Sequence, residues 1–166
     1  MSHSVTITRT TTTTSGSAIL INTGYMKTFP GLLKLAQLIL GAVVVGILGY
    51  YIRRYNYLAS VSASELFFFT IAVAFLIGTF CLLLSCLISL STGGIISKTI
   101  YELIYHSIAF VLYLAASIAF LVQVVNKTSS IYAVYDWYLA ASIIGLVVSG
   151  LYLISAFLAQ KSYRGI

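Results

Sequence analysis

Few side chains in this chain of 166 residues could carry acid–base or metal chemistry. The acidic residues are Glu65, Glu102 and Asp136, and the histidines are His3 and His106. These residues form no metal-ligand cluster, and the sequence contains no phosphate-binding loop or nucleophile motif. We therefore expect that the chain is not an enzyme and that it binds no metal or cofactor.

Four polar residues form one grouping that could act together. Glu102 and His106 are four residues apart, so on a helix they would share a face. Lys34 and Gln37 lie near the start of an earlier apolar block. Because a charge inside a bilayer is costly unless it is paired or reaches the interface, we predict a Lys34–Glu102 pair with Gln37 and His106 bonding nearby. This group would be either a structural latch or a binding or proton-handling site.

The elements that must position these residues are long apolar blocks. Hydrophobic residues make up 60% of the chain and charged residues 7%, against roughly 25% charged residues in a soluble domain. A helix needs about 20 apolar residues to cross a bilayer. Four such blocks are present, so the sequence predicts an all-α fold, a four-helix transmembrane bundle. We place its helices at about 32–51, 66–90, 100–125 and 137–159.

The chain divides into one membrane domain and two tails. Residues 1–27 form a Thr-rich tail that we expect to be disordered, either as a phosphorylatable cytosolic segment or as a solvated leader. Residues 28–160 form the transmembrane domain, and 161–166 form a short second tail. Short links between helices make neighbours antiparallel, which gives an up-down-up-down bundle.

The basic residues predict the orientation of the bundle. With both termini cytosolic, the cytosolic side holds six basic residues and the outer side three, in agreement with the positive-inside rule. The first set is Arg9, Lys27, Lys34, Lys98, Lys161 and Arg164, and the second is Arg53, Arg54 and Lys127. The four polar residues then lie at one depth, in the cytosolic leaflet.

Small residues recur at a spacing that lets helices pack closely. Stripes of this kind bring helix backbones together in lipid. They could face the interior of the bundle, which we favour, or another protomer. The residues are Ala42 and Gly46, Ala74 and Gly78, Ala115 and Ala119, and the series Ala141, Gly145 and Ser149.

The sequence contains candidate sites for two kinds of covalent modification. Cys81 and Cys86 are five residues apart, which turns them about 140° from each other on a helix, so they cannot form a disulfide with one another. We expect both to be buried, with Cys86 a weak candidate for palmitoylation. Asn126 begins the single glycosylation sequon. It abuts the end of a helix, so we expect it to be mostly unused.

Several segments resemble those of a known family. The stretch 25–41, from Tyr25 to Gly41, resembles the entry to the first helix of MARVEL-domain proteins, above all the chemokine-like factor (CMTM) and MAL/plasmolipin groups. The segments 110–117 and 151–166 are similar to the third helix and the end of such chains. The resemblance covers roughly residues 24–165, and the Thr-rich leader is similar to that of insect members.

This resemblance implies a MARVEL-type four-helix bundle with cytosolic termini and without catalytic residues. It also implies roles in membrane apposition, vesicle trafficking, cell junctions or the stabilisation of partner proteins. The expected partners are membrane lipids, cholesterol among them, other integral membrane proteins and further copies of the chain. The expected locations are the plasma membrane and secretory or endosomal vesicles. The net charge of +6 arises largely from scarce acidic residues and does not indicate nucleic-acid binding.

Two functions follow from these observations. The first is a membrane-organising or adaptor protein that acts through lateral contacts of its helices with lipids and proteins. The alternative is an oligomeric channel or transporter, because Glu102, His106, Ser117 and Gln123 form a weak polar stripe on the third helix.

Overall fold

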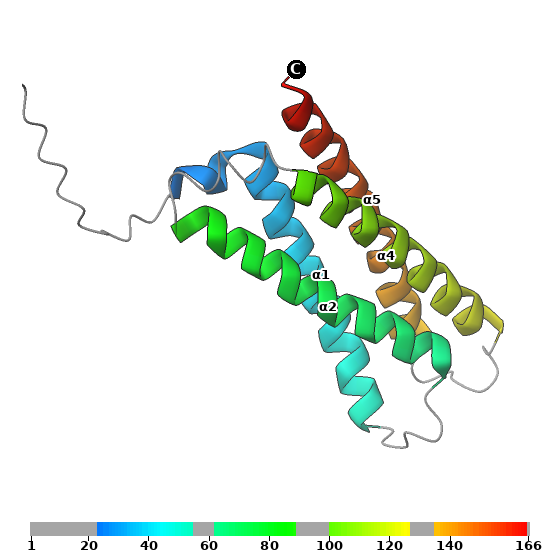
Figure 1. Cartoon of the computed structure of the whole chain (residues 1–166). Coiled ribbons are helices and arrows are strands. Elements are labelled where there is room, and N and C mark those ends of the chain that lie inside the picture. The colour runs from blue at the N-terminus through cyan, green and yellow to red at the C-terminus, as the bar shows by residue number, and fades with distance from the viewer. Residues whose placement is uncertain (1–22, 55–61, 89–99, 127–134, 166) are drawn as a thin grey trace, which may run out of the picture.

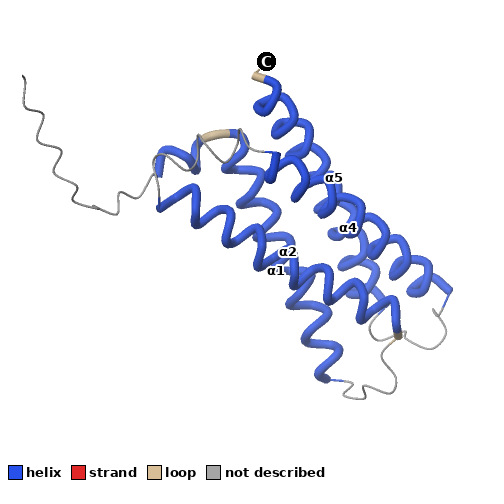
Figure 2. The backbone as a smooth tube through the Cα atoms, in the orientation of Figure 1, coloured by secondary structure: helices blue, strands red, loops and turns tan. Residues whose placement is uncertain are grey.

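The computed structural model describes residues 23–54, 62–88, 100–126 and 135–165. The described chain is helical almost throughout (Figure 2), and four of its helices are long and apolar enough to cross a membrane. The prediction of an all-α, four-helix transmembrane bundle is confirmed. In chain order the elements are η1 (Thr23–Lys27), α1 (Phe29–Arg54), α2 (Ala63–Ile88), α4 (Ile100–Asn126) and α5 (Tyr135–Arg164).

The four long helices form a closed ring in cross-section. Helix α1 packs against α2 and α5, and α4 packs against α5 and α2. Helices α1 and α4 therefore face each other across one diagonal of the bundle, and α2 and α5 across the other. Both η1 and the end of α5 lie at the same end of the bundle (Figure 1). We call this end the terminal end, and the one where α2 and α5 begin the opposite end.

Helices α1 and α2 begin earlier than their apolar blocks do, because capping residues start them. The Thr28 hydroxyl accepts a hydrogen bond from the Gly31 amide at 3.3 Å, which makes Thr28 the N-cap of α1. Ser62 caps α2 in the same way, accepting from the Glu65 amide at 3.3 Å. The series Ser-Ala-Ser-Glu at 62–65 has the spacing of a capping box.

Helix α5 continues past the predicted end of its apolar block. It ends at Arg164 rather than near 159, because the polar residues that follow the block still favour helix outside the hydrocarbon. Lys161 and Arg164 lie in the last turn, where cations interact favourably with the helix dipole. Gly165 ends the helix with a φ of 72°, a backbone conformation that glycine adopts readily.

One part of the predicted tail is ordered. Residues Thr23–Lys27 form the 3-10 helix η1, within a segment that we expected to be disordered. The Tyr25 carbonyl accepts hydrogen bonds from the Thr28 amide at 3.0 Å and from the Thr28 hydroxyl at 2.7 Å. These local bonds stabilise a turn that hydrophobic patterning does not indicate. Residues 1–22 lie outside the described chain.

The core of the bundle is aromatic. Phe68, Tyr113, Phe120 and Tyr152 are almost completely buried. The rings of Phe68 and Phe120 have centroids 5.5 Å apart, and those of Tyr113 and Tyr152 are 5.6 Å apart, within the range of favourable aromatic pairs. These four side chains belong to a larger hydrophobic core that also includes Leu48, Phe75 and Val148.

Candidate functional site

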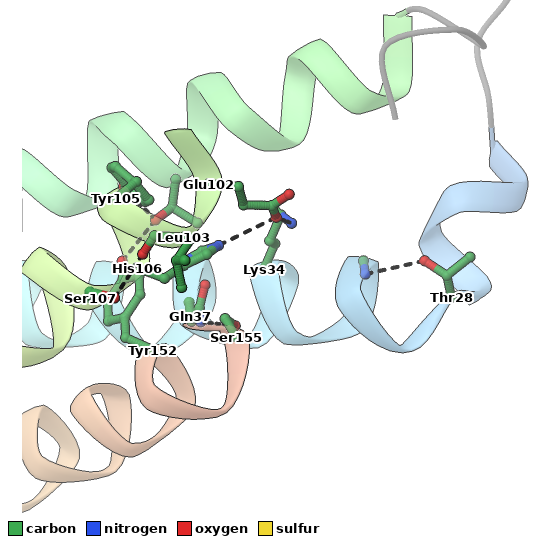
Figure 3. A network of polar contacts seen from close by, with 12 residues as sticks. Thr28, Lys34, Gln37, Glu102, Leu103, Tyr105, His106, Ser107, Tyr152 and Ser155 are labelled. Carbon is green, nitrogen blue, oxygen red and sulfur yellow. Dashed lines mark hydrogen bonds and ion pairs between the residues drawn. The ribbon is translucent and has the colours of Figure 1, made fainter. Parts of the chain in front are cut away.

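A buried ion pair joins α1 to α4 near the terminal end. The Lys34 ammonium donates a hydrogen bond to the Glu102 carboxylate (Figure 3). Lys34 is 2% exposed and Glu102 is 5% exposed. Each residue lies in the first turns of its helix, and because both helices begin at the terminal end, the two side chains meet across the bundle diagonal. The structure thus brings together the two residues that we expected to pair.

His106 and Gln37 lie beside this pair, but neither forms a normal hydrogen bond with Lys34 or Glu102. The His106 Nε2 atom is 3.4 Å from Glu102 Oε1, a distance longer than a normal hydrogen bond. Gln37 donates to the Ser155 hydroxyl of α5 at 2.8 Å rather than to Glu102. Within the described chain, neither ring nitrogen of His106 nor the Gln37 carbonyl has a hydrogen-bond partner.

Helix η1 adds a residue that the sequence did not suggest. The Tyr25 hydroxyl accepts a hydrogen bond from the Lys34 ammonium at 3.0 Å. Burial raises the pKa of Tyr25 from its ordinary value of 10 to about 12. Tyr25 is nine residues before Lys34 and outside the apolar blocks, so helical periodicity could not place it here.

The charges of this site cancel within the bundle. One ammonium faces one carboxylate, and both are withdrawn from solvent. Removing one partner of such a buried pair leaves an uncompensated charge, which costs several kcal/mol. Among the described residues, no group of three or more His, Cys, Asp or Glu side chains could hold a metal ion. The geometry fits a structural connection better than acid–base chemistry on a substrate.

A second polar cluster lies at the opposite end. The Tyr138 hydroxyl of α5 donates to the buried Glu65 carboxylate of α2, and Gln123 of α4 donates to the Ser62 hydroxyl. Sequence reasoning missed this cluster. The capping-box spacing of Ser62 and Glu65 could have located the start of α2, but the Tyr138 partner depends on tertiary packing.

The small-residue stripes fall on two kinds of surface. On α5 the stripe is buried. A Cβ atom on Gly145 would lie 2.4 Å from Ser117 Oγ and 2.5 Å from Phe68 Cζ, so this glycine permits close packing of three helices. These stripe residues face the interior, as we favoured: Ala141, Gly145 and Ser149.

The stripes on α1 and α4 face outward instead. Ala42 and Gly46 are exposed on α1, and a Cβ on Gly46 would meet nothing within 4 Å. Ala115 and Ala119 are exposed on α4. The preference for intramolecular packing was wrong for these two helices, because the bundle uses other faces of α1 and α4 for its core.

On α2 the two stripe residues differ. Ala74 is exposed and Gly78 is half-buried, where a Cβ would lie 2.6 Å from the Tyr105 hydroxyl of α4. Only Gly78 of this pair therefore contributes to packing between helices of the bundle.

The modification candidates also differ in exposure. Cys81 is exposed and Cys86 is buried, so the expectation that both are buried was wrong for Cys81. Cys86 is 2% exposed, and palmitoylation there remains a prediction that would require the thiol to leave its packed position. Asn126 is exposed at the end of α4, and the other two sequon residues lie outside the described chain.

The comparison with family models identifies the class of protein. The model of the MARVEL family, described as a membrane-associating domain, matches residues 25–158. This match covers more than half of the chain, and the chain belongs to the MARVEL family. It is a multi-pass integral membrane protein. No match was found among curated proteins or among solved structures.

Proposed function

We propose that this chain is a membrane-organising adaptor that binds other integral membrane proteins through the outward faces of its helices. The observation that carries the proposal is the outward position of the small residues on α1 and α4. Small residues let a second helix approach closely in lipid, and the fold of the bundle itself does not use these positions. Membrane association is the property of the family as a whole.

The distribution of polar side chains supports lateral contacts. Three charged or amide side chains within the spanning helices turn inward and are buried, namely Lys34, Gln37 and Glu102. The outward faces carry large apolar residues such as Ile39, Val111 and Phe157. A surface of this kind meets lipid and apolar helices. The proposed settings are the plasma membrane and secretory or endosomal vesicles, in trafficking, membrane apposition or partner stabilisation.

Burial of the polar stripe on α4 argues against the channel alternative. Glu102, His106 and Ser117 point into the bundle and are at most 5% exposed. In an oligomeric pore these side chains would have to face a central axis outside the bundle. Within the bundle, the aromatic core separates the two polar clusters. Ion flux that depends on Glu102 after reconstitution would nevertheless favour a channel.

The proposal predicts that a larger side chain in place of Gly46 weakens partner binding and leaves the fold intact. A Gly46→Leu variant should keep the thermal stability of the wild type, because Gly46 is exposed on the outer face of α1 and a Cβ atom there would meet nothing within 4 Å. Quantitative co-purification in mild detergent should show a loss of about tenfold in the companion proteins of the wild type, the factor that ~1.4 kcal/mol represents.

Ile143→Leu is the matched control, because Ile143 is outward on α5 and 51% exposed, and the small-residue stripe of α5 is buried. This variant should retain the companions of the wild type. If Gly46→Leu and Ile143→Leu retained the same companions in the same amounts, the α1 stripe would not be a binding surface.

A further inference from the structure

We propose that η1 is a releasable clasp, in which the buried Lys34–Glu102 pair holds the segment entering the membrane against the bundle through the Tyr25 hydroxyl. The clasp consists of η1, the Tyr25 side chain and the Lys34 ammonium. In the docked state η1 packs against α1 and α2. In the released state η1 leaves these helices without unfolding α1.

The docked position rests first on the side chain of Tyr25. The Lys34 ammonium donates to both the Tyr25 hydroxyl at 3.0 Å and the Glu102 carboxylate, so one cation links η1 to α4. The ammonium also lies 5.8 Å from the centroid of the Tyr25 ring, within the range of a cation–π contact. Because Glu102 fixes the ammonium, the ion pair sets the position of the group to which Tyr25 binds.

The backbone of Tyr25 gives a second point of attachment. Its carbonyl approaches the start of α1 so closely that a Cβ on Gly31 would lie 2.2 Å from the carbonyl oxygen. Only glycine at position 31 permits this contact. Helix η1 also packs against α2 as well as α1, so it bridges the first two long helices at the terminal end (Figure 1).

The clasp is weaker than the bundle that it covers. It is a single short turn whose residues 24–27 are exposed or half-buried, whereas Lys34 and Glu102 are buried between long helices. Short exposed elements open locally at lower free energy than packed cores do. Release of η1 therefore requires the loss of the Lys34–Tyr25 hydrogen bond and cation–π contact, the local bonds from Thr28 to the Tyr25 carbonyl and a small contact area. The four spanning helices stay in place.

Limited proteolysis of the full chain in nanodiscs tests the clasp. Lys27 lies at the end of η1 and is exposed, but trypsin must unwind the segment around it to cut. A Tyr25→Phe variant removes the hydroxyl alone, and we expect cleavage after Lys27 to become about tenfold faster, since each tenfold corresponds to ~1.4 kcal/mol. Cleavage after Arg164, at the end of α5, should keep its rate and serves as an internal reference.

Tyr101→Phe is the matched control, because Tyr101 lies at the start of α4 at the same end of the bundle and is 59% exposed. It should leave both cleavage rates unchanged. Glu102→Gln keeps the shape of the side chain and removes the charge that fixes Lys34, so it should also speed cleavage after Lys27. If this variant fails to fold, Tyr25→Phe decides the question alone.

Two results would overturn the proposal. One is equal cleavage after Lys27 in the wild type, Tyr25→Phe and Tyr101→Phe. The other is a rise for Tyr25→Phe that is matched by faster cleavage after Arg164 and a lower melting temperature of the whole bundle, because the hydroxyl would then stabilise the fold in general. Neither measurement involves a partner protein, so the clasp can fail while the adaptor function stands.

Discussion

At the scale of single residues, two glycines in similar stripes have different structural roles in this bundle. Gly145 lies where α5 meets Phe68 and Ser117, and a Cβ there would overlap both side chains. Gly46 has the same spacing in a small-residue stripe, yet its surroundings are open. The packing of the neighbours, rather than the motif, decides what each glycine does.

Alanine at these two glycines should therefore have opposite effects on stability. Gly145→Ala should lower the free energy of unfolding by about 1–3 kcal/mol, the usual cost of overpacking a core, because the fully buried Phe68 has little space to move. Gly46→Ala should leave stability unchanged or raise it by up to about 1 kcal/mol, since alanine favours helix. Thermal unfolding in detergent compares them, and equal melting temperatures would show that Gly145 is not a close contact.

At the scale of elements, α1 and α4 lie across one diagonal of the bundle, and the Lys34–Glu102 pair connects them. A Glu102→Ala change leaves the Lys34 ammonium buried without a counter-charge. We expect a loss of about 3–5 kcal/mol in stability, as for other buried pairs broken on one side. Replacing both residues by leucine should recover most of it, because no buried charge then remains.

Thermal or detergent-induced unfolding of the wild type, Glu102→Ala and the double leucine variant checks this prediction. Lys161→Ala is the control, because Lys161 lies exposed in the last turn of α5, and its loss should change stability by less than about 0.5 kcal/mol. A Glu102→Ala variant that assembled as stably as the wild type would contradict the structural role of the pair.

Much of the arrangement of the helices can be predicted from the sequence. Apolar blocks long enough for a bilayer indicate the four spanning helices, and the spacing of Glu102 and His106 indicates their common face. The cost of a lone charge in lipid indicates Lys34 as the partner of Glu102. The starts of helices are harder to predict in this way, because Thr28 and Ser62 start helices outside the apolar blocks. Tyr25 and Tyr138 could not be assigned, since their partners are determined only when the helices pack.

At the scale of the whole molecule, the bundle carries one buried carboxylate near each end. Glu102 binds Lys34 across the α1–α4 diagonal, and Glu65 accepts from Tyr138 across the α2–α5 diagonal. Each contact joins the α1–α2 pair of helices to the α4–α5 pair. The two clusters share no residue, and the aromatic core lies between them.

The separation of the clusters predicts additive effects. The losses in unfolding free energy for Glu65→Ala and Glu102→Ala should sum in the double variant to within about 0.5 kcal/mol, as for distant sites without shared partners. Unfolding curves of the four proteins supply the measurement. A double variant that is far more stable than the sum would mean that the two ends are coupled through the core.

The diagonal contacts also have a consequence for biosynthesis. A chain enters the membrane from its N-terminus, so the first two spanning helices are made before their polar partners exist. Glu102 follows Lys34 by 68 residues, and Tyr138 follows Glu65 by 73. The nascent first half therefore holds Lys34 without its counter-charge near the start of the first spanning helix. The cost there is below the ~2.5–3.5 kcal/mol of a lysine at mid-membrane, because the side chain can extend toward the interface. A partly synthesised chain would thus carry an unpaired Lys34 charge that the finished protein does not have. A chain ending after residue 90 should be degraded faster in cells than the same fragment with Lys34→Leu, and equal half-lives would rule this out.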